Sequence, residues 1–332
     1  MKTRILLTSF AFTAISTATA QTTFLHFPAK EGPGKGKKVV LLAGDEEYRS
    51  EEAMPMLGKI LSQYHGFDCT VLFSADEQGN IKPGGGALLT NPAALDSAEL
   101  IVMSLRFRHW DDAAMKKFDS TYRRGVPFVA LRTSTHAFAG LKGEFEHYNF
   151  DSGKTWTGGF GKQVLGETWV AHHGGHKSEG TRTIVEPSAK ENPLLRGVET
   201  IFGESDVYTA KPPADATILL RGEVTETLDS KSPGVKNKKN DPMQAVAWTR
   251  LHKNEDGKTN RVFTTTLGAA SDLDDENHRR LVVNAVFWGL ELEIPAKAKA
   301  DLVDPITPTM YGFNSERKGI KVEDNAMGKS LK

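Results

Sequence analysis

Cysteine is nearly absent from this chain of 332 residues. Cys69 stands alone, which excludes an intramolecular disulfide and a zinc site made of several cysteines. Neither sign of charge is in excess, because 42 Lys and Arg residues stand against 42 Asp and Glu residues. Nucleic acids and anionic membrane surfaces both require an excess of Lys and Arg on one face. The balanced charge therefore argues against both kinds of partner, and the apolar neighbours of Cys69 predict a buried small residue rather than a nucleophile.

Long apolar runs are also missing, and the one notable short run lies at the N-terminus. Lys2 and Arg4 precede an apolar stretch over residues 5–15, and Ala18-Thr19-Ala20 fits a cleavage site. The run is too short and too rich in Ser and Thr for a good membrane span. We therefore predict a signal peptide over residues 1–20 and a periplasmic or secreted protein with no membrane contact after its removal. A buried N-terminal helix is the alternative.

The rest of the chain alternates short apolar runs with amphipathic patterns. The runs predict strands at residues 37–44, 67–73, 100–104, 127–131, 181–185, 245–250 and 261–267. The amphipathic patterns predict helices over 50–65, from Asp111 or Asp112 to Gly125, and over 278–290. This rhythm predicts an α/β fold, with a doubly wound, mostly parallel sheet and helices on both faces.

The predicted α/β domain spans residues 36–292 and is elaborated by long loops, notably around 140–180 and 231–241. Few apolar residues follow Pro295, so residues 293–332 are predicted to form a C-terminal extension on the surface. No internal repeat and no sharp shift of composition divides the chain.

Polar segments follow three of the predicted strands, where ligands bind in a doubly wound sheet. Guanidinium groups supply forked donors, and an aromatic ring packs against the apolar face of a sugar, so these segments suit a saccharide or a carboxylate. Charge complementation of a helix N-terminus and ordinary surface arginines are the alternatives. The predicted substrate-binding residues are Asp45, Glu46, Tyr48, Arg49, Arg106, Arg108, His109, Trp110, Arg132, Thr133 and Ser134.

The segment from Arg132 to His136 lies where a nucleophile elbow would lie, directly after a buried strand. Its Ser and Thr hydroxyls could act as nucleophiles, and His136 could act as a base. No Gly-x-Ser-x-Gly pattern surrounds them, however, and a Ser/Thr-rich helix start would look the same.

Histidines are densest in the segment HHGGH, which contains His172, His173 and His176. Three imidazoles so close together could bind a divalent metal, could bind substrate or transfer protons, or could be structural. Glu204 and Asp206 could pair with one of them and set its protonation. Asp272 precedes the last helix, where it could cap the helix or face the site.

The order of these motifs resembles the ThuA-like (trehalose utilisation) family, over roughly residues 38–290. In the first half of the chain, the resemblance rests on GDEEYR and SLRFRHW, each directly after a predicted strand, and on Gly125-x-Pro127 before the next strand. In the second half, it rests on NPLLRG at 192–197 and on Glu204-x-Asp206-x-Tyr208. The last motif is Arg261-Val262-Phe263, which leads to Gly268 and to a final helix that contains Phe287-Trp288. The family shares the flavodoxin-like fold of the class I glutamine amidotransferases. The resemblance implies a carbohydrate-related role. It does not imply amidotransferase activity, because Arg132 or Thr133 stands where those enzymes carry their elbow Cys.

The leading hypothesis is an exported enzyme that acts on a glycoside or an oxidised sugar by acid-base chemistry, without a Cys nucleophile. Its predicted catalytic residues are His136, His172, His173, Glu204 and Asp206. The alternatives are a non-catalytic saccharide-binding module and a metal-dependent hydrolase that uses the HHGGH segment. We expect a small-molecule carbohydrate as ligand, no cofactor under the leading hypothesis, and either a monomer or a homo-oligomer.

Overall fold

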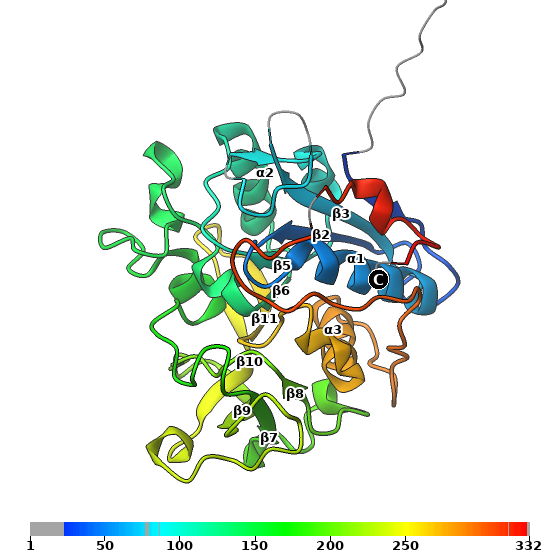
Figure 1. Cartoon of the computed structure of the whole chain (residues 1–332). Helices are drawn as coiled ribbons and strands as arrows, with labels where there is room; N and C mark the ends of the chain where they lie inside the picture. Colours follow the sequence, from blue (N-terminus) through cyan, green and yellow to red (C-terminus); the bar gives the residue numbers. More distant parts are fainter. Residues whose placement is uncertain (1–22, 77–79, 86, 318, 331–332) are drawn as a thin grey trace, which may run out of the picture.

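The computed structural model describes residues 23–76, 80–85, 87–317 and 319–330, so the predicted signal peptide lies outside the described residues. The described chain forms one sheet of 11 strands with three α-helices (Figure 1). The strands are β1 Leu25–Phe27, β2 Lys38–Gly44, β3 Asp68–Ala75, β4 Leu88–Leu89, β5 Leu100–Leu105, β6 Phe128–Leu131, β7 Thr181–Val185, β8 Phe202–Gly203, β9 Thr217–Val224, β10 Gln244–Lys253 and β11 Thr259–Thr265. The helices are α1 Ser50–His65, α2 Asp112–Arg123 and α3 Glu276–Gly289.

Five parallel strands form the centre of the sheet, in the spatial order β3-β2-β5-β6-β11. Numbered along the chain, this order is 2-1-3-4-5, the order of flavodoxin-like folds. The prediction of a doubly wound parallel core is therefore confirmed. Beyond β11, strands β10, β9, β7 and β8 extend the sheet with antiparallel pairing. The sequence analysis missed β9 and the short strands β1, β4 and β8.

Both faces of the parallel core are buried. Along β2, Val39 and Leu41 belong to the apolar cluster under α1 and α3, while Val40 and Leu42 belong to the cluster under α2. Since successive side chains of a strand point to opposite faces, a strand covered on both sides must be apolar throughout. Burial of the strands on both faces therefore explains the continuous apolar runs in the sequence.

The helix starts agree with the local signals in the sequence. Asp111 caps α2 by accepting from the N–H of Ala114, and Asp275 caps α3 by accepting from the N–H groups of Asn277 and His278. A side-chain oxygen at this position satisfies backbone donors that have no partner inside the helix. Helix α1 ends at His65, and Gly66 caps it in a left-handed conformation that costs glycine little.

The C-terminal tail is more than a surface extension, which corrects that prediction. Ala300 is fully buried, and its carbonyl accepts from Arg279 of α3. Farther along, Glu52 of α1 accepts from the N–H and hydroxyl of Thr309 at 2.7 and 2.6 Å. These contacts bring Tyr311, which is 1% exposed, against the carboxyl end of β2. The polar composition of the tail hid this, because backbone groups such as the Ala300 carbonyl and the Thr309 N–H make part of its contacts.

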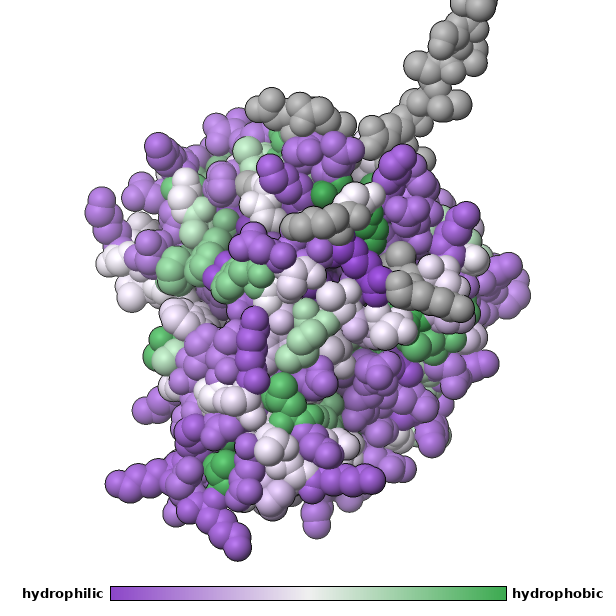
Figure 2. Space-filling view, viewed as in Figure 1, coloured by the Kyte–Doolittle hydropathy of each residue, from purple (hydrophilic) through white to green (hydrophobic). Residues whose placement is uncertain are grey.

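Polar side chains cover most of the face seen in Figure 2, where apolar residues form small separate groups. Among the described residues, the helices lack the combined length and hydropathy that a membrane span requires.

Candidate functional site

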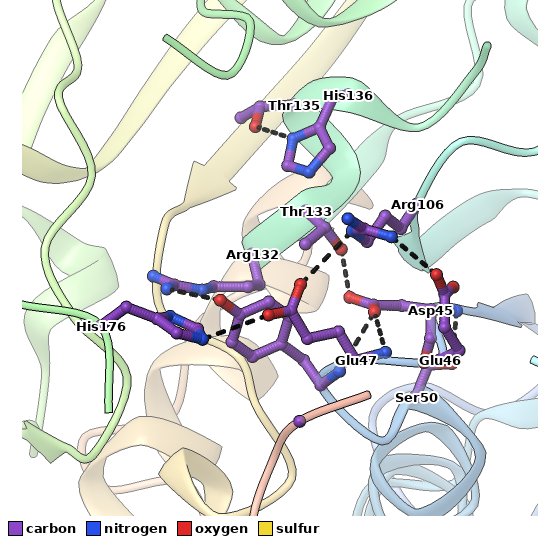
Figure 3. Close-up of polar contacts among 12 residues, drawn as sticks. Asp45, Glu46, Glu47, Ser50, Arg106, Arg132, Thr133, Thr135, His136 and His176 are labelled. Carbon is purple, nitrogen blue, oxygen red and sulfur yellow. Dashed lines mark hydrogen bonds and ion pairs between the residues drawn. The ribbon is translucent and has the colours of Figure 1, made fainter. Parts of the chain in front are cut away.

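Side chains from distant parts of the chain meet at the carboxyl ends of β2, β5 and β6, beside the point where the strand order reverses. The loop before β7, the segment after β8 and the C-terminal tail complete the group. We call it the strand-end cluster, and Figure 3 shows the part of it around Asp45, Glu47 and Arg132. Its members are Asp45, Glu46, Glu47, Tyr48, Arg106, Arg132, Thr133, His136, Trp169, His172, His176, Asp206, Tyr208 and Tyr311.

Arg132 occupies an elbow directly after β6. Its φ of 45° lies in the left-handed region, which is uncommon for a residue with a side chain. Its N–H donates to the carbonyl of Leu267 at 3.1 Å, and a single helical turn, Arg132–His136, follows. The predicted elbow position is therefore real, and a guanidinium group stands there in place of a nucleophile.

The guanidinium of Arg132 is fully buried and holds Asp206. It donates to the Asp206 carboxylate at 3.0 Å, to the Asp206 carbonyl at 2.6 Å and to the carbonyl of Thr266 at 2.7 Å. It also lies 3.7 Å from the centre of the Tyr208 ring and 4.5 Å from that of Tyr48. Burial alone would lower the pKa of Arg132, but Tyr208, Tyr48 and Asp206 raise it well above its usual value. Because no part of the side chain is exposed, Arg132 supports the site from inside, which corrects its prediction as a substrate contact.

Asp206 holds two imidazoles on its outer side. Nδ1 of His172 lies 2.7 Å from Oδ2, and Nδ1 of His176 lies 3.2 Å from Oδ1. The two rings are 36% and 28% exposed, whereas Asp206 is fully buried. Burial raises the pKa of Asp206, but Arg132 and His172 outweigh it and hold that pKa below its usual range. Asp206 is thus an ionised carboxylate that fixes the orientation of two half-exposed rings.

Glu47 lies between His176 and Arg106 (Figure 3). One carboxylate oxygen is 3.4 Å from Nε2 of His176, and the other is 3.4 Å from Nε of Arg106. Burial and the nearby Asp45 raise the pKa of Glu47 to about 7. The sequence analysis did not assign Glu47 a role, although it belongs to the segment that follows β2.

Arg106 is the one predicted arginine that remains partly exposed in the cluster. It pairs with Glu46 at 2.6 Å, and its guanidinium lies 4.5 Å from the ring centre of Phe107. Arg108 is 3% exposed and donates to the carbonyls of Arg106 and Pro83, at 2.7 and 2.6 Å. Arg108 therefore orders two loops, which corrects its prediction as a substrate ligand.

Asp45 and Thr133 form a buried pair behind the cluster. The Thr133 hydroxyl donates to one oxygen of Asp45, and the other oxygen accepts from the N–H groups of Glu47 and Tyr48 at 2.9 and 3.1 Å. Burial raises the pKa of Asp45 despite these donors. Both residues are fully buried, so their predicted contact with substrate is replaced by a role in shaping the turn after β2.

His136 lies among aromatic rings. Phe107, Trp169 and Tyr208 have ring centres 5.0, 5.8 and 6.4 Å from its own. Burial, with Arg106 as a further cause, lowers the pKa of His136 well below its usual value. The ring is therefore neutral at physiological pH.

Three predicted residues belong to the body of the fold, and each of these predictions is corrected. Trp110 is 2% exposed and packs with Phe118 and Phe138, so its ring is closed to a sugar. Arg49 is buried and donates to the carbonyls of Glu46 and Gly312, which fastens the C-terminal tail. Ser134 is buried and donates to the carbonyl of Met103 at 2.9 Å.

Three other predicted site residues keep their side chains outside the cluster. His109 is exposed after β5, and His173 turns away to the carbonyl of Lys239 at 2.8 Å. Glu204 lines a separate cavity of about 470 Å³ with Ser271 and Asp275, and its carbonyl accepts from Tyr311. Asp272 is buried and binds the hydroxyl and N–H of Ser205, so it anchors the segment before Asp206 rather than facing the site.

Trp169, Tyr208 and Tyr311 belong to the cluster and were not predicted as site residues. Trp169 stands three residues before the HHGGH segment, and Tyr208 stands two after Asp206, so proximity to those motifs was the available signal. Tyr311 stacks on Tyr48 with ring centres 5.0 Å apart, and nothing local marks it.

No protein-family model matches this chain, and no curated protein matches it. Solved structures do match. A ThuA-like protein from Bacteroides uniformis is 14% identical, with a TM-score of 0.47 over 79% of this chain and 94% of that chain. A second, from Parabacteroides merdae, is 12% identical, with a TM-score of 0.46 over 85% of this chain and 98% of that one. The chain is similar to ThuA-like proteins of known structure.

The mmIFT52 N-terminal domain also matches, at 12% identity and a TM-score of 0.41, over 77% of this chain and 97% of that chain. Identities and TM-scores this low say nothing of activity. The flavodoxin-like fold is assigned by the strand order itself.

Proposed function

We propose that this protein is a carbohydrate-active enzyme that transfers protons at the strand-end cluster. The observation that carries the proposal is the pairing of buried Asp206 with the half-exposed ring of His172, at 2.7 Å from Nδ1. When Nδ1–H donates to a carboxylate, Nε2 is the nitrogen that can accept a proton. Glu47 stands beside the second imidazole, His176, and supplies a carboxyl group for the opposite transfer.

The surroundings of His172 support a sugar as the substrate. Trp169 is partly exposed, and its ring centre lies 5.9 Å from that of His172. An aromatic face packs against the apolar face of a sugar ring, and a guanidinium such as that of Arg106 can donate to hydroxyl or carboxylate oxygens. The resemblance to the ThuA-like family agrees with this choice. The signal-like pattern of residues 1–20 supports a substrate outside the cytoplasm.

Substitution of His172 and Glu47 tests the proposal. We expect His172→Gln and Glu47→Gln each to lower turnover of the active sugar by roughly 100-fold to 10,000-fold, because each removes a proton-transfer group. The measurement is turnover by the purified mature chain of a panel containing trehalose, other disaccharides, and aldonic and uronic acid glycosides. His173→Gln is the matched control, since it changes the neighbouring imidazole, which turns away to Lys239.

Circular dichroism of each variant confirms that a loss of turnover is not a loss of fold. Turnover that survives both substitutions would contradict the roles given to His172 and Glu47. Binding of a panel sugar with no turnover would instead identify a saccharide-binding module.

A further inference from the structure

We propose that His172, His176 and Asp206 bind a divalent transition-metal ion. The inference rests on the proposed function in placing the sugar and Glu47 at this cluster, but it makes Nδ1 of His172 a ligand of the ion in place of the proton donor to Asp206. One donor atom from each of the three residues lies within 4.8 Å of the others. They come from two separate segments, the loop before β7 and the segment after β8, so the fold and not local sequence brings them together.

Two of the donor separations can be compared with those required on one ion. Donor atoms bound to a tetrahedral zinc at about 2.0–2.1 Å lie roughly 3.3 Å apart. Nδ1 of His176 is 3.2 Å from Oδ1 of Asp206, so this pair needs almost no movement. Nδ1 of His172 is 2.7 Å from the other carboxylate oxygen, Oδ2, so its ring must shift outward for one ion to meet both imidazoles and the carboxylate. A ring 36% exposed has room for that shift.

The ligand set selects the class of ion. Two imidazoles and one carboxylate suit Zn²⁺ and its first-row neighbours, whereas Mg²⁺ and Ca²⁺ prefer oxygen ligands. Three protein ligands also leave a coordination position open, as in catalytic rather than structural sites.

The second shell is already in place. Arg132 donates to Asp206 from the buried side at 3.0 Å and fixes the carboxylate, while the imidazoles approach from the exposed side. Outer contacts of this kind orient a ligand before the ion arrives. On the exposed side of the three ligands, the carboxylate of Glu47 lies 3.4 Å from Nε2 of His176.

A bound ion would change the roles of the residues in the cluster. The imidazoles would serve as ligands, and the ion would polarise a carbonyl or hydroxyl oxygen of the sugar. Glu47, which contacts His176 but is not one of the three ligands, would remain as the proton-transfer group.

Titration of the purified mature chain with ZnCl₂ after chelator treatment tests the site. We expect one Zn²⁺ per chain by elemental analysis and by calorimetry, and an affinity at least roughly 100-fold weaker in His172→Ala and in His176→Ala. His173→Ala should bind as the wild type does, because its ring contacts Lys239 instead. MgCl₂ should give no heat of binding. ZnCl₂ should raise the midpoint temperature of thermal unfolding in the wild type and in His173→Ala, but not in His172→Ala or His176→Ala.

Failure of the wild-type chain to bind Zn²⁺ stoichiometrically would overturn the inference, as would an equal loss of affinity in His173→Ala. Turnover that is indifferent to the chelator but lost in His172→Gln would overturn it while leaving the proposed function standing. Stoichiometric Zn²⁺ with no turnover of any panel sugar would support the metal site and contradict the proposed function. Glu47→Gln should keep its Zn²⁺ and lose turnover.

Discussion

Replacing Arg132 with methionine should lower the free energy of unfolding by about 3–5 kcal/mol. The substitution keeps the volume of the side chain but leaves the Asp206 carboxylate, which is fully buried, without its cation. The carbonyl of Thr266 and the rings of Tyr48 and Tyr208 lose the same partner. Urea denaturation near pH 7, followed by tryptophan fluorescence, measures the difference.

Two controls isolate the effect of the buried charge. Lys35→Met removes an exposed ion pair with Glu31, and it should change the stability by less than about 1 kcal/mol. Adding Asp206→Asn to Arg132→Met should cost less than the sum of the two single changes, because the uncompensated charge is then gone. A loss below about 1 kcal/mol in Arg132→Met would show that the pair does not support the site as described.

Glu51→Gln should make the protein more stable at pH 8 and remove a pH dependence of stability. Glu51 is buried in the first turn of α1, and neither carboxyl oxygen has a hydrogen-bond partner among the described residues. Burial raises the pKa of Glu51 from 4.5 to about 8, although the helix N-terminus favours the ionised form.

The sign of the effect follows from proton binding. Between pH 4.5 and 8 the folded protein keeps a proton on Glu51 that the unfolded chain has released, so stability falls as the pH rises through this window. Between pH 4.5 and 8, the free energy of unfolding decreases by roughly 4 kcal/mol through this group. Glutamine stays neutral at every pH, so the stability difference between Glu51→Gln and the wild type should grow steadily from pH 5 to pH 8.

Urea denaturation of the wild type and of Glu51→Gln at pH 5, 6, 7 and 8 measures that difference. Glu31→Gln is the matched control, since Glu31 is exposed and its substitution should leave the pH profile unchanged. Parallel profiles for the wild type and Glu51→Gln would mean that Glu51 is ionised in the folded protein.

The parallel core and its strand ends could be predicted because their signals are local. Continuous apolar runs such as that of β2 mark strands buried on both faces, and the capping aspartates mark helix starts. The rule that ligands bind beyond the carboxyl ends of parallel strands then selected the segments that hold Glu46, Arg106 and Arg132. Strand β9 was not predicted, because buried and exposed residues alternate irregularly along it in the antiparallel part of the sheet.

Which side chain of a selected segment faces outward could not be predicted, because long-range packing decides it. Trp110 and Trp169 both lie near polar, aromatic segments, yet Phe118 and Phe138 enclose Trp110, while Trp169 stays beside His172. Tyr311 joins the cluster through contacts with Tyr48, far away along the chain. No pattern within a short stretch of sequence encodes such a pairing.

The indole N–H signals of the five tryptophans test most directly whether the strand-end cluster is the functional site. They can be followed by ¹H–¹⁵N NMR as the turned-over sugar is added to Glu47→Gln, with signals assigned through Trp169→Phe and Trp110→Phe. We predict that the Trp169 signal shifts in a saturable way while the signal of the enclosed Trp110 stays in place. A saturable shift that spares Trp169 would place the sugar elsewhere on the protein and contradict the account.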